Sequence, residues 1–352
     1  MSETSYSFLD RLFHRIVLGL PWIQEISLDI DRLVSTGKNQ ENDGKPVFIC
    51  GLARAGTTIL MRSIYETGFF RSLTYNDMPF VLMPCLWRRI SRPFRYRDTE
   101  KERAHGDGIL VSFSSPEAFE EIFWKTFCRK DYIFENCLKT HSVNDEVIEQ
   151  FRSYIGQVLN SADNFKQSRY LSKNNNNILR LKTIRKAFPD ALIIIPFRDP
   201  IQQSISLFNL HSKFYAMHEK DRFSLDYMRW LGHHEFGGVH KQFKFEDNRL
   251  FNEKKPDDIN YWITVWIRTY QFLLNSAPEK SVFFSFEELC SAPNKTLADL
   301  FTFAGLSKEK NSMAEIIIPP KLRDIENIDE NLKEQALGVY LALSSRSHES
   351  FR

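Results

Sequence analysis

Apolar residues along this chain occur in two patterns, short continuous blocks and longer stretches with helical spacing. Two blocks, VFIC at 47–50 and ALIIIPF at 191–197, are apolar throughout, which is typical of parallel strands covered on both faces. RYLSK at 169–173 has the length of a further short strand, and SVFFSFEEL at 281–289 predicts a strand that runs into a loop. The sequence therefore predicts several buried strands of the parallel type.

Helical patterns separate these strands. They cover 57–68, 115–127, 145–162, 177–188, 202–214, 259–278 and 295–306. Strands that alternate with helices at this spacing are typical of parallel βαβ units. We predict an α/β fold, a doubly wound parallel sheet flanked by helices, with a helical insertion near 80–165.

The chain divides into three predicted parts, an N-terminal helical extension (1–40), an α/β domain (45–320) and a C-terminal helical tail (321–352). In the extension, apolar residues recur at helical spacing, namely Leu9, Leu12, Phe13, Ile16, Val17 and Leu20. Charges interrupt this run and no small-residue cleavage site follows it, so it does not resemble a signal peptide. We expect this face to pack on the α/β domain rather than to lie on a membrane.

Composition narrows the partners and the compartment. Of the 352 residues, 42% are hydrophobic and 26% are charged, and the formal net charge is only +2, which argues against nucleic acid as a partner. The five cysteines lack CxxC spacing, which favours reduced thiols and a cytoplasmic protein. No apolar run reaches the length of a membrane span. Peripheral contact with a membrane through the N-terminal helix remains open.

A glycine loop, GLARAGTT at 51–58, follows the first strand and opens a helix. Backbone amides in such a turn, with the helix N-terminus behind them, form a site for a phosphate or another anion. A Walker A loop has lysine directly after its last glycine, but here Thr57 follows Gly56. The loop is therefore P-loop-like without the lysine that binds the phosphates of ATP.

This loop resembles the 5′-phosphosulfate loop of the sulfotransferases that use 3′-phosphoadenosine 5′-phosphosulfate (PAPS). The resemblance rests on Arg54, Ala55, Gly56, Thr57 and Thr58. It implies a P-loop NTPase-like fold, PAPS as co-substrate, and a loop in which Arg54 supplies the cation.

A second motif, FRDPIQQSIS at 197–206, follows the strand at 191–197. The family has an arginine at the end of such a strand and a serine eight residues later, and Arg198 and Ser206 meet that spacing. The resemblance implies that these two residues bind the 3′-phosphate of the donor. A guanidinium suits this role because it is permanently charged and bidentate.

Lys173, which ends the strand at 169–173, lies close to the position of the family's catalytic lysine. The tripeptide Lys139-Thr140-His141 resembles another sulfotransferase signature, but it lies 57 residues before Arg198, too far for the family spacing. We interpret it as a coincidental match and assign the catalytic role to Lys173.

The general base is left open between two residues. In the carbohydrate and tyrosine branch of the family it is often a carboxylate soon after the loop's helix, where Asp77 is the only acid. His105 is the alternative, because an imidazole titrates near neutral pH.

The segment GHHEFGGVH at 232–240 lacks the spacing of a metalloprotease motif. We predict no metal site there and interpret the segment as a glycine-flanked lid near the acceptor.

The resemblance implies a PAPS-dependent sulfotransferase of the carbohydrate/tyrosine-type branch. The expected partners are a small-molecule nucleotide donor and a hydroxyl acceptor, with a carbohydrate or glycolipid favoured over other lipids, small metabolites and tyrosine. The alternative is a P-loop kinase or NTPase with a degenerate phosphate loop. Nothing in the sequence indicates the oligomeric state.

Overall fold

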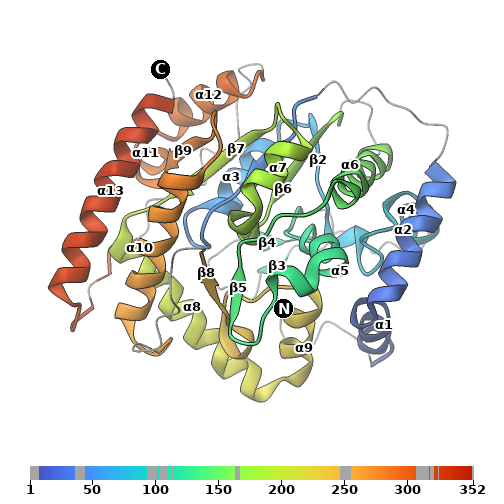
Figure 1. Cartoon of the computed structure of the whole chain (residues 1–352), viewed down its shortest axis with the longest axis horizontal. Coiled ribbons are helices and arrows are strands. Elements are labelled where there is room, and N and C mark those ends of the chain that lie inside the picture. Colours follow the sequence, from blue (N-terminus) through green and yellow to red (C-terminus); the bar gives the residue numbers. More distant parts are fainter. Residues whose placement is uncertain are drawn as a thin grey trace.

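The computed structural model describes residues 8–35, 44–92, 101–102, 110–111, 115–162, 167–245, 255–306, 317, 321–323 and 325–350. At the centre of these residues lies a parallel sheet with strand order β2-β6-β1-β7-β9 (Figure 1). Its strands are β1 (Val47–Ile49), β2 (Phe70–Arg71), β6 (Arg169–Lys173), β7 (Leu192–Phe197) and β9 (Val282–Ser285). From β1 the chain first forms β2 and β6 on one side of β1 and then crosses to form β7 and β9 on the other side. The sheet is therefore doubly wound, and the predicted fold class is confirmed.

Alternating side chains of the strands divide the core between the two faces of the sheet. Phe48, Ile193 and Ile195 belong to one buried cluster, and Val47, Ile49 and Ile194 to the other. The first cluster includes residues of α6 (Asp145–Asn160), α7 (Leu181–Ala187), α8 (Pro200–Lys220), α10 (Ile259–Ser276) and α13 (Glu330–Ser350). The second includes residues of α3 (Thr57–Tyr65), α11 (Phe286–Ser291) and α12 (Pro293–Phe303). Both faces are therefore covered, as continuous apolar strands require.

The predicted helical insertion lies between β2 and β6. It contains η1 (Tyr75–Asp77), α4 (Pro84–Ser91), β3 (Lys101–Glu102), β4 (Leu110–Val111), α5 (Glu121–Tyr132), β5 (Cys137–Lys139) and α6. β3 and β4 pair antiparallel with each other. β5 pairs in parallel with β8 (Gln242–Lys244), outside the central sheet.

Two elements differ from the sequence prediction. The helix expected at 177–188 begins as a 3-10 helix, η3 (Asn175–Arg180), before α7. The asparagine side chains explain this difference, because Asn174 accepts a hydrogen bond from the amide of Asn176 and so competes with α-helical geometry. The loop expected after β9 is instead α11, which Ser285 caps by accepting from the amide of Glu288.

The N-terminal extension contains two helices, α1 (Phe8–Gly19) and α2 (Pro21–Ser35), and α9 (Arg222–Leu231) packs against α1. The expectation that the apolar face of the first helix packs on the domain is wrong for most of that face. Val17 is buried, but Leu12, Phe13, Ile16 and Leu20 are 39–44% exposed. The physical reason is that His14, Val17 and Leu18 already supply the buried stripe, so the remaining apolar residues turn outward. No described helix combines the length and the apolarity needed to cross a bilayer.

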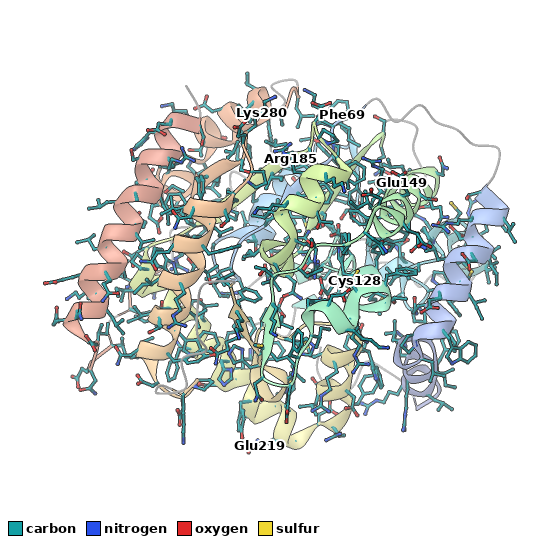
Figure 2. The ribbon with its side chains drawn as sticks, viewed as in Figure 1. Phe69, Cys128, Glu149, Arg185, Glu219 and Lys280 are labelled. Carbon is teal, nitrogen blue, oxygen red and sulfur yellow. The ribbon has the colours of Figure 1, made fainter. Side chains whose placement is uncertain are left out.

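A buried polar network joins the insertion to the central sheet. The Glu121 carboxylate accepts from Arg180 at 2.7 Å and from Asn174 at 2.7 Å, and Tyr132 also donates to it. Burial alone would raise the pKa of Glu121, but Arg180 and the neutral donors outweigh it and lower that pKa. Figure 2 shows the side chains that fill this interior, with Cys128 of α5 among them. The carboxylate is therefore charged and fully paired.

The preceding residue extends the network. Glu120 accepts from Trp124 at 3.0 Å, from Asn177 at 3.0 Å and from Tyr170 at 2.9 Å. Tyr170 lies on β6 and Asn177 on η3, the helix that follows β6. The start of α5 is therefore hydrogen-bonded both to this strand and to the helix after it.

We expect Arg180→Met to lower the free energy of unfolding by about 3–5 kcal/mol, because it leaves Glu121 buried without its cation. Chemical denaturation followed by tryptophan fluorescence measures this loss. The matched control is Lys186→Met, which removes an ion pair whose side chains are 61% and 82% exposed and should change stability little. Similar losses in both variants would contradict a special role for the buried pair.

Candidate active site

The carboxyl ends of the parallel strands meet at one edge of the sheet, where the predicted site residues gather. Register places Lys173 opposite Ile49 across β6 and β1, and the amide of Cys50 donates to the carbonyl of Ile194 at 2.8 Å. The glycine loop follows β1 and Arg198 follows β7. An edge of this kind, where the winding reverses, is where open α/β sheets bind ligands.

The glycine loop adopts left-handed backbone at two positions, Arg54 with φ 71° and Gly56 with φ 78°. At Gly56 a Cβ atom would lie 2.4 Å from Cδ2 of Phe286, so a side chain is excluded by contact as well as by backbone conformation. A non-glycine residue in this region is uncommon and concentrates at functional sites. Helix α3 begins at Thr57 directly after the loop, which puts Thr57 and Thr58 in its first turn.

Gln203 of α8 binds the backbone of the glycine loop, and the sequence did not predict this role. Its side chain is fully buried, donates to the carbonyl of Ala53 at 2.9 Å and accepts from the indole of Trp266 at 2.9 Å. Tyr270 of α10 donates to the carbonyl of Pro196 at 2.9 Å. These bonds fix the loop relative to β7, α8 and α10. The only local signal for Gln203 is its place within the second motif.

The two motifs meet directly. Nε of Arg54 donates to the hydroxyl of Ser206 at 2.9 Å, although the residues are 152 positions apart. Phe286, which packs against Gly56, also lies beneath Arg198, whose guanidinium carbon is 5.1 Å from the ring centroid. The structure thus brings Arg54, Gly56, Arg198 and Ser206 together.

Arg198 is 8% exposed, and burial lowers its pKa while the nearby Glu287 opposes that shift. An arginine remains protonated at neutral pH even so. The neighbouring Asp199 makes hydrogen bonds with Gln202 and Glu287. Its carboxylate accepts from the amide of Gln202 at 2.8 Å, and its own amide donates to Glu287 at 2.9 Å. Asp199 therefore caps α8.

A cavity of about 530 Å³ opens beside Arg198. Its walls include Ile201 of α8, Phe286 and Glu287 of α11, and Leu322 and Tyr340 from the C-terminal tail. Burial raises the pKa of Glu287, to which Tyr340 donates at 3.3 Å. The volume of this cavity is within the range of cavities that bind small organic molecules.

Lys173 ends β6 beside a carboxylate that sequence analysis did not predict as part of the site. Its Nζ lies 3.4 Å from Oε1 of Glu117, and the two side chains are 10% and 12% exposed. Oε1 of Glu117 also accepts from the amide of Ala118 at 3.0 Å. No local pattern could have identified Glu117, because it precedes Lys173 by 56 residues and lies within an ordinary helical stretch.

The two bases predicted from the sequence have different outcomes. Asp77 is fully buried, with one oxygen 2.6 Å from Nη2 of Arg71 and the other bound to the amide and hydroxyl of Thr74. A carboxylate held in this way caps η1 and balances a buried arginine, so we do not retain it as a base. His105 lies outside the described residues.

Leu52 and Ala53 of the glycine loop line a second, smaller cavity of about 30 Å³. Asn175, Glu235, His240 and Trp262 are also among its lining residues, and the amide of Asn175 donates to Glu235 at 3.1 Å. Part of the 232–240 segment therefore borders the loop.

The imidazoles of that segment bond mainly to the backbone. His234 pairs with the carbonyl of Val239 and His240 with that of Glu235, and burial lowers the pKa of His240 to about 3. Among the described residues, no group of histidine, cysteine, aspartate and glutamate side chains is arranged to hold a metal ion. Lys139, from the tripeptide treated as a coincidental match, lies on β5 with its Nζ over the Phe134 ring.

Comparison with known proteins identifies the family of this chain. A model of the sulfotransferase family matches residues 46–236, more than half of the chain. No curated protein matches the sequence.

Solved structures of sulfotransferases match this chain at low sequence identity. A sulfotransferase from Mycobacterium tuberculosis is 14% identical with a TM-score of 0.47, covering 96% of this chain and 88% of that one. One from Mycobacterium avium is 13% identical with a TM-score of 0.46, covering 98% and 86%. One from Alicyclobacillus acidocaldarius is 14% identical with a TM-score of 0.38, covering 87% and 95%.

We expect Gly56→Ala to destabilise the chain more than Gly68→Ala, although both glycines have φ 78°. Gly68 has open space around it, so alanine there costs only the left-handed backbone, about 1–2 kcal/mol. At Gly56 the displacement of Phe286 adds about 1–3 kcal/mol. Denaturant unfolding of both variants measures the difference, and equal losses would mean that Phe286 yields without cost.

Proposed function

The chain belongs to the sulfotransferase family, and from this membership we propose that it transfers a sulfuryl group from PAPS to an acceptor hydroxyl, on a carbohydrate or a glycolipid. The observation that carries the proposal is the hydrogen bond between Arg54 and Ser206, at 2.9 Å. It joins the loop that resembles a 5′-phosphosulfate site to the motif that resembles a 3′-phosphate site. A donor with anionic groups on both sides of its ribose would need such a pair.

The residues present fit this donor. Backbone amides of the loop and the first turn of α3 suit the 5′ end, with Arg54 as cation and the Thr57 and Thr58 hydroxyls as further donors. Arg198 and Ser206 suit the 3′-phosphate. The cavity of about 530 Å³ next to Arg198, with Phe286 and Tyr340 in its walls, would hold the nucleoside.

In the proposed reaction the acceptor oxygen attacks sulfur in line with the departing phosphate oxygen. One S–O bond forms as the other breaks, and 3′,5′-ADP leaves with the bonding electrons. Glu117 takes the acceptor's proton in place of the two bases predicted from the sequence, which is supported by its contact with Lys173. Arg54 and Lys173 stabilise the charge that develops on the leaving oxygen.

This chemistry needs less charge compensation than phosphoryl transfer, because a sulfuryl group carries less negative charge. Cationic side chains can therefore take the role that magnesium has in kinases. The same reasoning favours the sulfotransferase over the kinase alternative, since Thr57 stands where a kinase-type loop has lysine.

We propose that the acceptor hydroxyl enters beside the smaller cavity. Its volume of about 30 Å³ suits a hydroxyl-bearing group rather than a whole sugar ring. Glu235 and Asn175 offer hydrogen bonds there, and Trp262 offers an apolar surface. This combination supports a carbohydrate-type acceptor.

Isothermal titration with 3′,5′-ADP, 5′-AMP and Mg-ATP tests the donor. We expect binding that requires the 3′-phosphate and that weakens by about tenfold or more in Arg198→Ala, because a buried charge-assisted contact is lost. Arg222→Ala, which removes an arginine with a 76% exposed side chain on α9, should bind like wild type. Binding of Mg-ATP without binding of 3′,5′-ADP would favour the kinase alternative and reject PAPS.

Glu117→Gln tests the proposed base. We expect the rate of sulfuryl transfer from radiolabelled PAPS to a pool of glycolipids and polysaccharides to fall by a factor of about 10²–10⁴, with unchanged affinity for 3′,5′-ADP. The acidic limb of the pH–rate profile should disappear in this variant, which a purely structural role would not cause. Glu149→Gln, at a carboxylate 66% exposed on α6, is the control. A rate within a few-fold of wild type would remove Glu117 from the mechanism.

A further inference from the structure

The N-terminal helices carry an apolar surface that faces away from the protein. On α2, Trp22, Ile26, Ile30 and Leu33 are 56%, 49%, 41% and 78% exposed. Their spacing places all four on one side of the helix, opposite Gln24, Leu28 and Asp31, which are buried. The apolar side of α2 therefore faces outward, while its buried side is mostly polar, with Leu28 as its apolar residue.

The neighbouring helix continues this surface. Leu12, Phe13 and Ile16 of α1, and Leu20 directly after it, are 39–44% exposed, whereas Val17 and Leu18 are buried. α1 and α2 pack against each other and lie at one end of the molecule (Figure 1). We call the exposed residues of the two helices the N-terminal apolar surface. Exposed apolar residues that gather on two adjacent helices are typical of an interaction site.

Arginines are exposed on α1 and on α4, the helix that packs against α2. Arg15 on α1, and Arg89 and Arg92 at the end of α4, are exposed. α4 packs against α2, and its Trp87 meets Phe13 of α1 with ring centroids 6.4 Å apart. Among the described side chains of α1, α2 and α4, the exposed carboxylates are Glu25 and Asp29. Asp29 is paired with Arg32 at 3.5 Å.

We propose that the N-terminal apolar surface binds the surface of an anionic lipid bilayer. Helix α2 would lie in the plane of the membrane, with Ile26, Ile30 and Leu33 in the boundary between headgroups and acyl chains. Trp22 suits this depth, because tryptophan is enriched at membrane interfaces. Arg15, Arg89 and Arg92 would face the negative headgroups.

Charge decides between a bilayer and a second copy of the chain. Two copies joined through this surface would bring together two sets of arginines that outnumber the exposed carboxylates Glu25 and Asp29, and like charges disfavour such contact. An anionic bilayer gives the same arginines opposite charge. The proposal is independent of the donor and acceptor chemistry of the active site.

Sedimentation with lipid vesicles tests the proposal on the full chain. One set of vesicles contains phosphatidylcholine alone, and in the other phosphatidylglycerol replaces about a third of it. We expect the wild-type chain to sediment with the anionic vesicles, less with the neutral ones, and less at high salt.

Two double variants separate this surface from general stickiness. Ile26→Glu with Ile30→Glu should weaken vesicle binding by about a hundredfold, because two apolar side chains no longer enter the bilayer. Leu337→Glu with Leu341→Glu changes two leucines of α13 that are 54% and 60% exposed, and should leave binding unchanged. Both changes are on outward-facing positions, and circular dichroism checks that the variants fold.

The wild-type arm alone can overturn the proposal, since a chain that stays in solution with both kinds of vesicle does not bind membranes. Equal loss in the two double variants would also overturn it. Light scattering gives the third outcome. A wild-type dimer that Ile26→Glu with Ile30→Glu converts to monomer would mean that the surface pairs two copies instead.

Discussion

The geometry of the candidate site depends on two adjacent carboxylates that cannot be buried without partners. Glu120 and Glu121 stand at the start of α5, and their oxygens are satisfied by Arg180, Asn174, Asn177 and Tyr170. These partners lie on β6 and on the segment that follows it. Because a buried carboxylate without donors is costly, the insertion has one well-defined position against the sheet.

The position of the insertion against the sheet brings Glu117 next to Lys173. Glu117 is three residues before Glu120, and Lys173 precedes Asn174 directly, so attaching the two segments brings a carboxylate and an ammonium group together at 3.4 Å. The pair that we place at the reaction centre is thus supported by a pair deeper in the core. A positioned carboxylate on an insertion needs such support, since an error of an ångström would remove it from a reacting hydroxyl.

Sequence predicts much of this molecule where the signal is local. Apolar blocks of strand length located β1 and β7. The two motifs, Arg54 to Thr58 and Arg198 to Ser206, each lie at a strand-to-helix junction as predicted, and their donor-binding roles stay a prediction from the family resemblance. Partners that are distant in sequence could not be found. Glu117, Gln203 and Phe286 contact residues that are 56, 150 and 230 positions away in the sequence, and no pattern in a single chain reports such contacts.

For Asp77 the local signal points to a different role from the one that the structure shows. Its position in the sequence suits a general base, but the carboxylate is buried and paired with Arg71. The outward face of α1 does not follow from the sequence, because helical periodicity shows which residues share a face but not what covers that face.

The glycine loop is braced by parts of the chain that come long after it. Gln203 of α8 holds its carbonyl, Phe286 of α11 lies against Gly56, and Tyr340 of α13 closes the neighbouring cavity. During synthesis on a ribosome, the first strand and its loop emerge well before these residues, and domains generally fold from their N-terminal end. The cavity beside Arg198 can therefore be completed only after residue 340 has left the exit tunnel. A nascent chain that stops short of residue 340 would carry the glycine loop without the wall that Tyr340 gives to this cavity.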